Sequence, residues 1–512
     1  MFARRTFLAG PAALLGGRAV ARASGAAEVT CPAGRFLGER VDGVTRFRGI
    51  RYGRAERFRR AVAIPPSRDP VRATAFGPAC PQRGKYRPQS EDCLFLNIWT
   101  PQASTGARLP VMVYVHGGAY ANGSVTDPEN DGASLAAKGV VLVTVNHRLN
   151  ALGYLYLAPF DPRFPDSGNN GQLDLVLALQ WVRANIAAFG GDPGRITMFG
   201  QSGGGAKIAT LTAMPEARGL FHRAATMSGQ QVAVTGADRS AERARVYLAA
   251  LRVSPHDLSP LLALPVENLL DALATRDPFE DSPVYMGPVL DGRNVTRHPF
   301  SPDAAPAARE IAWMLGGTRD ETRAYFDPEG AGMRALGWDK VGAMIAAELP
   351  VRAPVEAIVA EYRRRLPALS PADIFFAATS DGRSWRPLLD EAEALANAGH
   401  PAFVYQFDFA SPVEPARGAF HALDIPFVFG TLTGSPAGNG AAARAVSAAM
   451  QARFVAFART GVPNAPGLPV WPAYRVRDRS TMIFDRRSRV VRDPRGWQRR
   501  LFAPYPYTQP GT

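Results

Sequence analysis

Long apolar runs are missing from this chain of 512 residues. No run reaches the ~18 residues that a membrane-spanning helix needs, so we expect no stable insertion in a membrane. The hydrophobic share of 46% and the charged share of 20% are those of an ordinary globular protein. A chain of this length can form two or more domains, or one large α/β domain with insertions.

Lysine is scarce, and the formal charge of +14 comes almost entirely from arginine. Arginines cluster at residues 363–365 and 486–489, but both clusters are short and lack the interleaved aromatic residues of a nucleic-acid surface. We therefore predict solvated arginine-rich faces and no nucleic-acid partner, while a weak preference for acidic surfaces or substrates stays open. The only lysines are Lys85, Lys138, Lys207 and Lys340.

Cysteine is rarer still, and the chain has only Cys31, Cys80 and Cys93. None of them lies in a recognisable nucleophile context, so we predict no catalytic cysteine. Cys80 and Cys93 close a short polar loop, and we expect a disulfide between them that stabilises the fold by about 3 kcal/mol. Cys31 would then remain a free thiol.

The N-terminus has the order of regions found in export signals. Arg4 and Arg5 precede an apolar, Gly/Ala-rich stretch, and residues 21–23 offer a small-residue cleavage site. This resembles a twin-arginine signal, with a disordered basic tail as the alternative. Removal of residues 1–23 would lower the formal charge from +14 to +10, because this segment holds four arginines and no acid. We expect a mature chain at 24–512 that is periplasmic or secreted.

Short β-rich segments alternate with helical patterns from about residue 94 onward. A helix is predicted over 173–189, ending at a Gly-Gly-Asp-Pro turn. Segments 230–310 and 327–400 are helical and poor in strand signals, so we interpret them as insertions around the sheet. The alternation predicts a single α/β domain with a mostly parallel central sheet covered by helices. Strands are expected at 94–100, 111–115, 140–145, 196–199, 311–315 and 403–407, and a possible edge strand at 482–484.

Residues 196–206 show the pattern of a strand, a tight turn and the start of a helix. The turn holds Ser202 out as a candidate nucleophile, between Gly200 and Gly204 in a Gly-x-Ser-x-Gly motif. The N–H groups at the start of the following helix favour the negative charge that attack on an ester carbonyl generates. The bare motif is weak evidence, because about 0.2 chance matches are expected in a chain with 49 glycines.

A second glycine-rich turn follows the strand at 111–115. There the N–H groups of Gly118 and Ala119, together with that of Gly203 after the nucleophile, would form an oxyanion hole with three donors. His116 precedes these residues and should shape the loop. An ordinary turn is the alternative reading of this segment.

A serine nucleophile also needs a base and an orienting acid. His421 is the best candidate base, because it follows both the nucleophile and a late strand. For the acid, Asp320 and Glu321 follow a strand as an adjacent pair, and Asp291 is a rival in an Asp-Gly turn. The other histidines are His116, His147, His222, His256, His298 and His400.

Together these motifs resemble the type-B carboxylesterase family, which includes acetylcholinesterase and bacterial p-nitrobenzyl esterases. The resemblance runs from about residues 47–50 to 471–474, nearly the whole mature chain. It is carried by residues 90–98, 116–120, 189–193, 199–204 and 420–423.

The resemblance implies an α/β-hydrolase fold with a Ser-Glu-His triad. Ser202 matches the family's nucleophile, Glu321 its acid because it is second in the Asp-Glu pair, and His421 its base. Cys80 and Cys93 match the family's N-terminal disulfide. The implied activity is hydrolysis of small-molecule carboxylic esters through an acyl-enzyme, with no metal or organic cofactor.

Two other functions stay open. The same site could serve an acyltransferase, or a lactone or amide hydrolase. The chain could also be a non-catalytic binding protein like the cholinesterase-like adhesion proteins, but those have typically lost the nucleophile, and all three triad positions are filled here.

The chain departs from the family pattern beside the nucleophile. Gln201 stands where the family usually has Glu, and Gly203 where it usually has Ala. A neutral amide removes a buried charge near the imidazolium, so the pH dependence of activity should change on Gln201→Glu. Ser228 resembles a supporting position and is expected to hydrogen-bond near Gln201, and Thr322 replaces a usual Gly after the acid.

Overall fold

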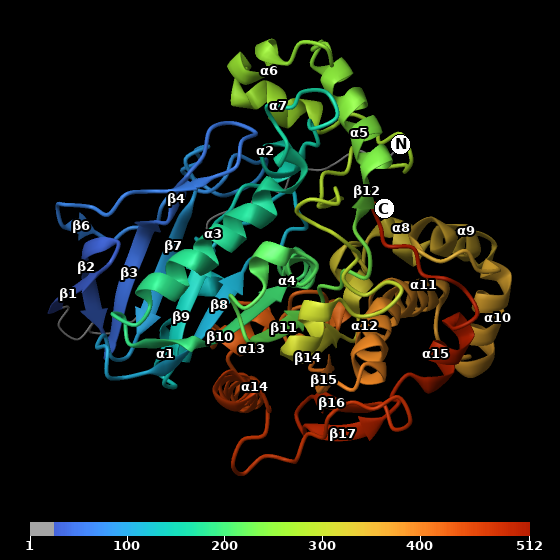
Figure 1. The fold of residues 1–512 in the computed structure, drawn as a ribbon. Helices are drawn as coiled ribbons and strands as arrows, with labels where there is room; N and C mark the ends of the chain where they lie inside the picture. The colour runs from blue at the N-terminus through green and yellow to red at the C-terminus, as the bar shows by residue number, and fades with distance from the viewer. Residues whose placement is uncertain (1–24) are drawn as a thin grey trace.

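The structure is a computed structural model that describes residues 25–512 (Figure 1). The predicted export signal at 1–23 lies outside the described residues. Within residues 25–512, no helix has both the length and the apolar character needed to cross a bilayer.

Seven neighbouring parallel strands form the middle of a 13-stranded sheet in the described chain. The predicted strands at 111–115, 140–145, 196–199, 311–315 and 403–407 all belong to this parallel part. In spatial order the seven are β9 (Val141–Val145), β8 (Leu109–Val115), β10 (Gly191–Gln201), β11 (Arg223–Met227), β14 (Ala312–Thr318), β15 (Ala402–Phe407) and β16 (Ser480–Phe484).

Antiparallel strands flank this parallel part on both sides. On the N-terminal side they are β7 (Phe95–Thr100), β3 (Val44–Arg51), β2 (Gly34–Val41) and β1 (Gly25–Cys31). β6 (Val71–Arg72) pairs with β2. Small two-stranded sheets join β4 (Gly53–Arg54) to β5 (Val62–Ala63) and β12 (Thr235–Gly236) to β13 (Val289–Leu290).

The segment at 482–484 is not the edge strand that the sequence suggested. It belongs to β16, which pairs with β15 on one side and with β17 (Arg489–Arg492) on the other. β17 is the actual edge, and no apolar pattern marked it, because its side chains are exposed or only half-buried.

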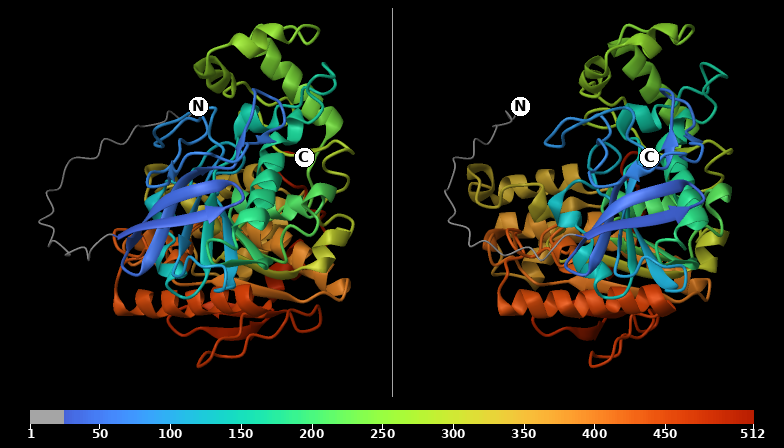
Figure 2. Two further views of the ribbon diagram at one scale, coloured as in Figure 1. Left: turned by 60° about the vertical axis from the view of Figure 1, so that its left-hand side comes forward. Right: turned by 90° about the vertical axis from the view of Figure 1, so that its left-hand side faces the viewer.

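The central strands read as continuous apolar runs because both faces of the sheet are covered. In β8, Val111 and Val113 pack into one hydrophobic cluster, and Met112 and Tyr114 pack into another on the opposite face. Helices α3 (Asn170–Asn185) and α4 (Gly203–Leu211) contribute to the first cluster, and α13 (Ile425–Phe429) and α14 (Ala441–Thr460) to the second. Figure 2 shows α14 lying along one face of the sheet.

The helical segments after residue 230 differ in how they pack. The segment 230–310 contains α5 (Ala237–Ala250), α6 (Ser259–Ala263) and α7 (Val266–Ala272), which project from one end of the molecule (Figure 1). In the segment 327–400, α9 (Trp338–Glu348), α10 (Val355–Arg365) and α11 (Pro371–Ser380) have a hydrophobic cluster of their own. α12 (Arg386–Asn397) instead packs into the main core. Shorter helices are α1 (Ala133–Ala136), α2 (Asn150–Tyr154), α8 (Ala331–Arg334) and α15 (Gly496–Phe502).

The disulfide expected between Cys80 and Cys93 is not formed in the structure, where both are buried free thiols. The two side chains adjoin, and their hydrogen bond together with burial raises the pKa of the Cys93 thiol. Cys31, at the end of β1, is also free and is half-buried.

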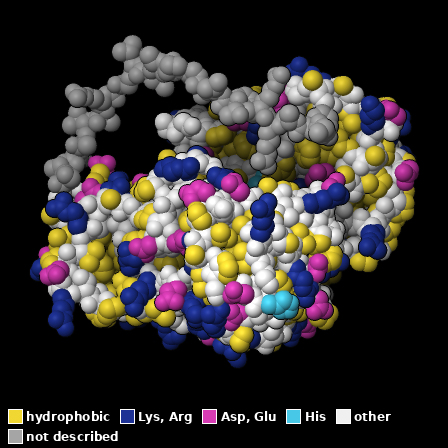
Figure 3. Space-filling model, turned by 90° about the horizontal axis from the view of Figure 1, so that it is seen from above, with side chains coloured by type: hydrophobic (Ala, Val, Ile, Leu, Met, Phe, Trp, Pro, Cys, Tyr) yellow, Lys and Arg dark blue, Asp and Glu magenta, His cyan; other side chains and the backbone are white. Residues whose placement is uncertain are grey.

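Charged side chains of both signs are interspersed on the face of the molecule seen in Figure 3. Many arginines have an acidic partner close by, as in the exposed pairs of Arg218 with Glu310 and Arg364 with Glu361. On this face, arginines are therefore interspersed with acidic side chains.

Candidate functional site

The nucleophile turn joins β10 to α4. Ser202 has φ 55° and ψ −128°, a strained conformation for a residue with a side chain, and its N–H donates to the Met227 carbonyl at 2.7 Å. A Cβ at Gly200 would lie 2.8 Å from the Val115 carbonyl oxygen, and one at Gly204 would lie 2.0 Å from the same oxygen. Both motif glycines are therefore required by the close approach of β8.

The loop after β8 lies against this turn. Gly118 and Ala119 both have positive φ, at 93° and 52°. A Cβ at Gly117 would lie 3.2 Å from the Ser202 Cβ, and one at Gly203 would lie 2.1 Å from the Ala119 carbonyl oxygen. Among the hydrogen bonds of residues 25–512, none uses the N–H of Gly118, Ala119 or Gly203. Three backbone donors are therefore available for an anionic oxygen.

Glu321 and His421 meet at the same edge of the sheet. Glu321 follows β14 and is 2% exposed, and His421 lies in the loop after β15. The His421 Nδ1 hydrogen-bonds the Glu321 Oε2. Because a carboxylate only accepts, Nδ1 carries the proton, and in the neutral ring Nε2 presents its lone pair.

Glu321 is held as a carboxylate by its surroundings. Its Oε1 accepts the Ser228 hydroxyl at 2.5 Å and the Thr318 N–H at 2.8 Å. Burial by itself would raise the pKa of Glu321, but His421 and these two donors outweigh burial, so the pKa lies below its ordinary value. Ser228 thus supports the carboxylate and does not bond Gln201, contrary to the expectation from sequence.

The two alternative acids have other partners. Asp320 accepts the Ala419 N–H at 2.9 Å and pairs with Arg319, so it ties down the loop that carries His421. Asp291 accepts backbone N–H groups of its own turn, including that of Asn294 at 2.7 Å.

Gln201 contacts the second ring nitrogen of His421. The Gln201 Nε2 lies 3.0 Å from the His421 Nε2, and with the lone pair on the ring nitrogen the amide donates. Within the described part of the chain, no hydrogen bond joins the Ser202 Oγ to His421. A neutral amide therefore occupies the lone pair of the His421 Nε2 in this structure.

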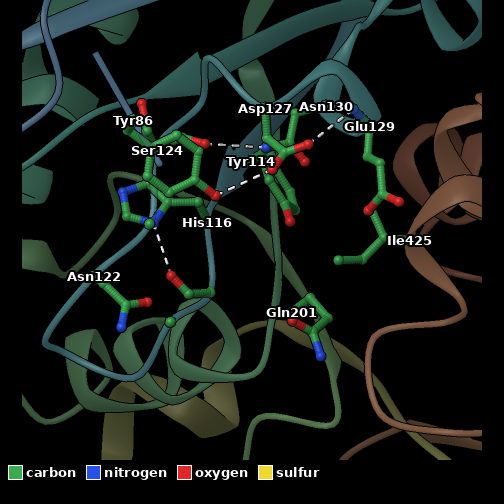
Figure 4. A pocket seen from close by; sticks show the side chains of 13 residues that line it. Tyr86, Tyr114, His116, Asn122, Ser124, Asp127, Glu129, Asn130, Gln201 and Ile425 are labelled. Atoms are coloured by element: carbon green, nitrogen blue, oxygen red, sulfur yellow. Dashed lines mark hydrogen bonds between the residues drawn. The ribbon is translucent and has the colours of Figure 1, made fainter. Parts of the chain in front are cut away.

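A cavity of about 150 Å³ opens beside the nucleophile turn (Figure 4). Gln201 and Gly118 form part of its wall. Tyr86, from the loop between Cys80 and Cys93, donates its hydroxyl to the Asp127 Oδ2 at 3.1 Å. The predicted disulfide loop thus supplies a side chain to the cavity. Further lining residues are Tyr114, His116, Asn122, Ser124, Glu129, Asn130 and Ile425.

His116 shapes the loop as a neutral ring. Its Nδ1 lies 2.8 Å from the Gly117 carbonyl oxygen, and its ring stacks on His147 with centroids 4.6 Å apart. Burial and then the nearby Lys207 lower the pKa of His116 to about 3. The His116 ring is therefore uncharged at neutral pH.

Lys207 is a residue of the site that sequence reasoning missed. It lies in α4, five positions after Ser202, and is fully buried. Burial lowers the pKa of its ammonium group to about 7. One signal could have revealed it, because Lys207 is the only charged residue between Arg195 and Glu216 in an otherwise small and apolar stretch.

No group of three or more metal-ligating side chains suited to a metal ion occurs in residues 25–512. The chemistry that the described groups can perform is nucleophilic attack by Ser202, proton transfer at His421 and stabilisation of an oxyanion.

We expect Ser228→Ala to lower stability at neutral pH and to make stability depend less on acid than it does in wild type. A carboxylate with a lowered pKa contributes stability that is present above its unfolded pKa and is lost as the pH falls through the folded pKa. Losing this hydrogen bond should cost about 1.5–3 kcal/mol at about pH 7, and the difference from wild type should shrink below about pH 4.5. Urea unfolding across this range measures it.

The matched control is Ser447→Ala, because Ser447 is also buried but donates to the neutral Phe427 carbonyl at 2.7 Å. Its cost should not vary with pH. A Ser228→Ala cost that is equally independent of pH would contradict the assigned role.

Comparison with known proteins identifies the relatives of this chain. The family model described as "Carboxylesterase family" matches residues 25–498. Para-nitrobenzyl esterase of Bacillus subtilis (strain 168) is 34% identical over 499 residues, covering 93% of this chain and 98% of the relative. Phenmedipham hydrolase of Pseudarthrobacter oxydans is 32% identical over 508 residues, covering 90% and 96%. The crystal structure of a Geobacillus stearothermophilus carboxylesterase matches with a TM-score of 0.83 and 34% identity, covering 93% of this chain and 99% of that one.

These similarities confirm the α/β-hydrolase fold and the prediction of a carboxylic ester hydrolase that acts on small-molecule esters. The resemblance that the motifs suggested extends over almost all of the chain and almost all of each of these relatives. The chain belongs to the carboxylesterase family.

Proposed function

We propose that this carboxylesterase works through a triad of Ser202, Glu321 and His421 and forms an acyl-enzyme. The observation that carries the proposal is the contact of the His421 Nδ1 with the buried Glu321 carboxylate, at the sheet edge where Ser202 is displayed. That contact fixes the tautomer in which Nε2 can accept a proton. The three unused N–H donors beside Ser202 support the same reaction.

The proposed reaction has two halves. In the first, Nε2 of His421 takes the Ser202 hydroxyl proton while Oγ attacks the ester carbon, and Gly118, Ala119 and Gly203 bind the resulting oxyanion. The bond to the alcohol breaks, and the alcohol leaves with the proton from His421. In the second half a water molecule gives a proton to His421 and attacks the acyl group, which releases the acid and restores Ser202.

Gln201 must release the base during this cycle. Its amide donates to the Nε2 that has to receive the serine proton, so the two donors compete for one lone pair. A carboxylate at this position could not donate to a neutral ring, but it would stabilise the imidazolium. The usual Glu and the Gln of this chain therefore act on opposite protonation states of His421.

We expect Gln201→Glu to move the acidic limb of the pH–rate profile of kcat/KM to higher pH. The introduced negative charge lies about 3 Å from the ring and favours the protonated base, which is inactive in the first step. Initial rates on a p-nitrophenyl ester between about pH 5 and pH 9 measure the shift. Gln201→Met serves as the uncharged control, and a Gln201→Glu profile unchanged from wild type would contradict the argument.

Ser202→Ala should abolish both turnover and labelling by a fluorophosphonate. We expect kcat to fall by about 10⁴-fold or more over a panel of esters graded in acyl length, because the covalent step is lost. The panel includes p-nitrobenzyl esters, which the name of one relative suggests as substrates. Ser447→Ala is the matched serine control and should retain activity.

Undiminished turnover or labelling in Ser202→Ala would overturn the assignment of the nucleophile. Product analysis with and without a competing alcohol separates hydrolysis from acyl transfer, since only an acyltransferase would favour the new ester over the free acid.

We also propose that residues 1–23 direct export and that Cys80 and Cys93 then form a disulfide. The order of regions in the N-terminal sequence supports export. The adjoining buried thiols support pairing, since the two sulfurs can bond when an oxidant of the oxidising periplasm takes up their two electrons and the two protons leave.

Expression of the full chain in a bacterium with a twin-arginine export system tests both parts. We expect activity in the periplasm and, after denaturation without reductant, one reactive thiol, that of Cys31. An Arg4→Lys/Arg5→Lys variant should remain in the cytoplasm with three reactive thiols. Cytoplasmic wild type would contradict export, and three thiols in the periplasmic protein would contradict the disulfide.

A further inference from the structure

Lys207 is a buried cation with no acidic partner. Its side chain is fully buried in α4, and among the ion pairs of residues 25–512 none includes it. Burying an ammonium group without a counter-charge is expensive unless other groups replace its water. The replacement must therefore come from uncharged groups nearby.

Those groups all belong to the loop after β8. The Lys207 Nζ donates to the Ala119 carbonyl at 2.7 Å and lies 3.5 Å from the His116 carbonyl oxygen. It also lies 5.2 Å from the centroid of the Tyr120 ring, within cation–π range. Every polar contact of this ammonium group is thus made with the segment 116–120.

The contacted carbonyls enclose the oxyanion donors. The His116 carbonyl belongs to the peptide before Gly117, and the Ala119 carbonyl to the peptide after Ala119. Between them lie the two peptides that carry the N–H groups of Gly118 and Ala119. An ammonium group that holds both flanking carbonyls therefore fixes the direction of both donors. It also holds Ala119 at φ 52°, where a residue with a side chain needs support.

Gly203 shows how closely the loop is held. A Cβ at this position would lie 2.1 Å from the Ala119 carbonyl oxygen and 2.5 Å from both its carbonyl carbon and its Cα. The oxygen that Lys207 contacts is the one that an alanine at 203 would strike. The departure from the family's usual Ala thus has a local cause.

We infer that Lys207 is a positioning residue that holds the oxyanion loop against α4, and that Gly203 is its obligatory partner because only glycine leaves room for the loop in that position. The inference rests on the proposed function of Ser202, since it concerns how the oxyanion of that reaction is bound. Lys207 itself touches neither substrate nor nucleophile.

Three titratable groups face Lys207. They are His116 and His147, which are buried and whose pKa values are lowered by burial and then by Lys207, and Tyr120. None is a carboxylic acid, so the ammonium group is the one cation in this cluster below about pH 7. Burial lowers its own pKa to about 7, so the hold on the loop should weaken as the pH rises through this value.

A double-mutant cycle with Gly203→Ala and Lys207→Met tests the pair. We expect each single change to lower kcat by about 10²-fold with KM changed less than about threefold, because oxyanion binding acts on the transition state. In the Lys207→Met background, adding Gly203→Ala should cost at least about tenfold less than in wild type, since the loop is then free to move away. Effects that multiply independently would overturn the inference.

Two further measurements exclude a merely structural role. Affinity for a trifluoromethyl ketone, whose hemiketal oxygen occupies the oxyanion hole, should fall in parallel with kcat. The kcat ratio of wild type to Lys207→Met should decrease above about pH 7, where the wild-type amine loses its charge. If Lys207→Met does not fold, Lys207→Gln keeps a donor without the charge and enters the cycle in its place.

Arg453→Met is the matched control for removing a buried cation. Arg453 is fully buried in α14 and donates to the carbonyls of Pro463 at 3.1 Å and Pro469 at 2.7 Å, with no acidic partner in the described chain. This variant should lose stability but keep its kcat and its ketone affinity. If Ser202→Ala stays active, the proposed function fails; if Ser202→Ala is inactive but the cycle is additive, only the role of Lys207 fails.

Discussion

The close approach of β8 to the turn after β10 is the constraint on which the site depends. The Val115 carbonyl oxygen would lie 2.8 Å from a Cβ at Gly200 and 2.0 Å from a Cβ at Gly204. The turn can therefore form only with glycine at both positions. In the same turn Ser202 has its strained conformation, at the edge of the sheet. The close approach of β8 also brings the loop 116–120 within reach of the nucleophile, so the strained turn and the oxyanion donors lie together.

The electrostatics of the site follow from burial combined with selected partners. Glu321 stays charged in the core because three donors converge on its two oxygens. His116 lies in a similarly buried place without an acidic partner, and it is neutral. The two imidazoles thus differ in their partners, since His421 contacts a carboxylate and His116 contacts a backbone carbonyl. Only the first arrangement suits a base that must carry a positive charge.

The departures from the family pattern are connected through the packing around Ser202. The Gln201 amide contacts His421, the proposed base, and Gly203 leaves room for the Ala119 carbonyl that Lys207 contacts. Gln201 puts a neutral donor where the family usually has a Glu. Gly203, in place of the usual Ala, leaves room for the carbonyl that the unpaired cation of Lys207 contacts. In the proposed site, a neutral amide therefore lies beside the base, and a buried ammonium group lies behind the oxyanion donors.

Much of the fold could be predicted from the sequence, since apolar runs such as 111–115 and 140–145 mark strands buried on both faces. The positions of Ser202, of the Asp320–Glu321 pair and of His421 after strands, and the glycines beside the serine, leave local signatures in the sequence. Those signatures left the acid open, and the choice of Glu321 came from the family resemblance. The edge strand β17 left no such signature, because its two half-buried valines lie next to each other between exposed arginines and show no apolar alternation.

The tertiary structure alone decided the contacts between distant segments. The Ser228 hydroxyl bonds Glu321 and not Gln201, the Gln201 amide reaches His421, and Lys207 points at the Ala119 carbonyl. Spacing along the chain determines that a turn or a strand forms and which residues it displays. Which polar groups then meet across the sheet edge is determined by the packing of several strands together, and no single segment encodes that geometry.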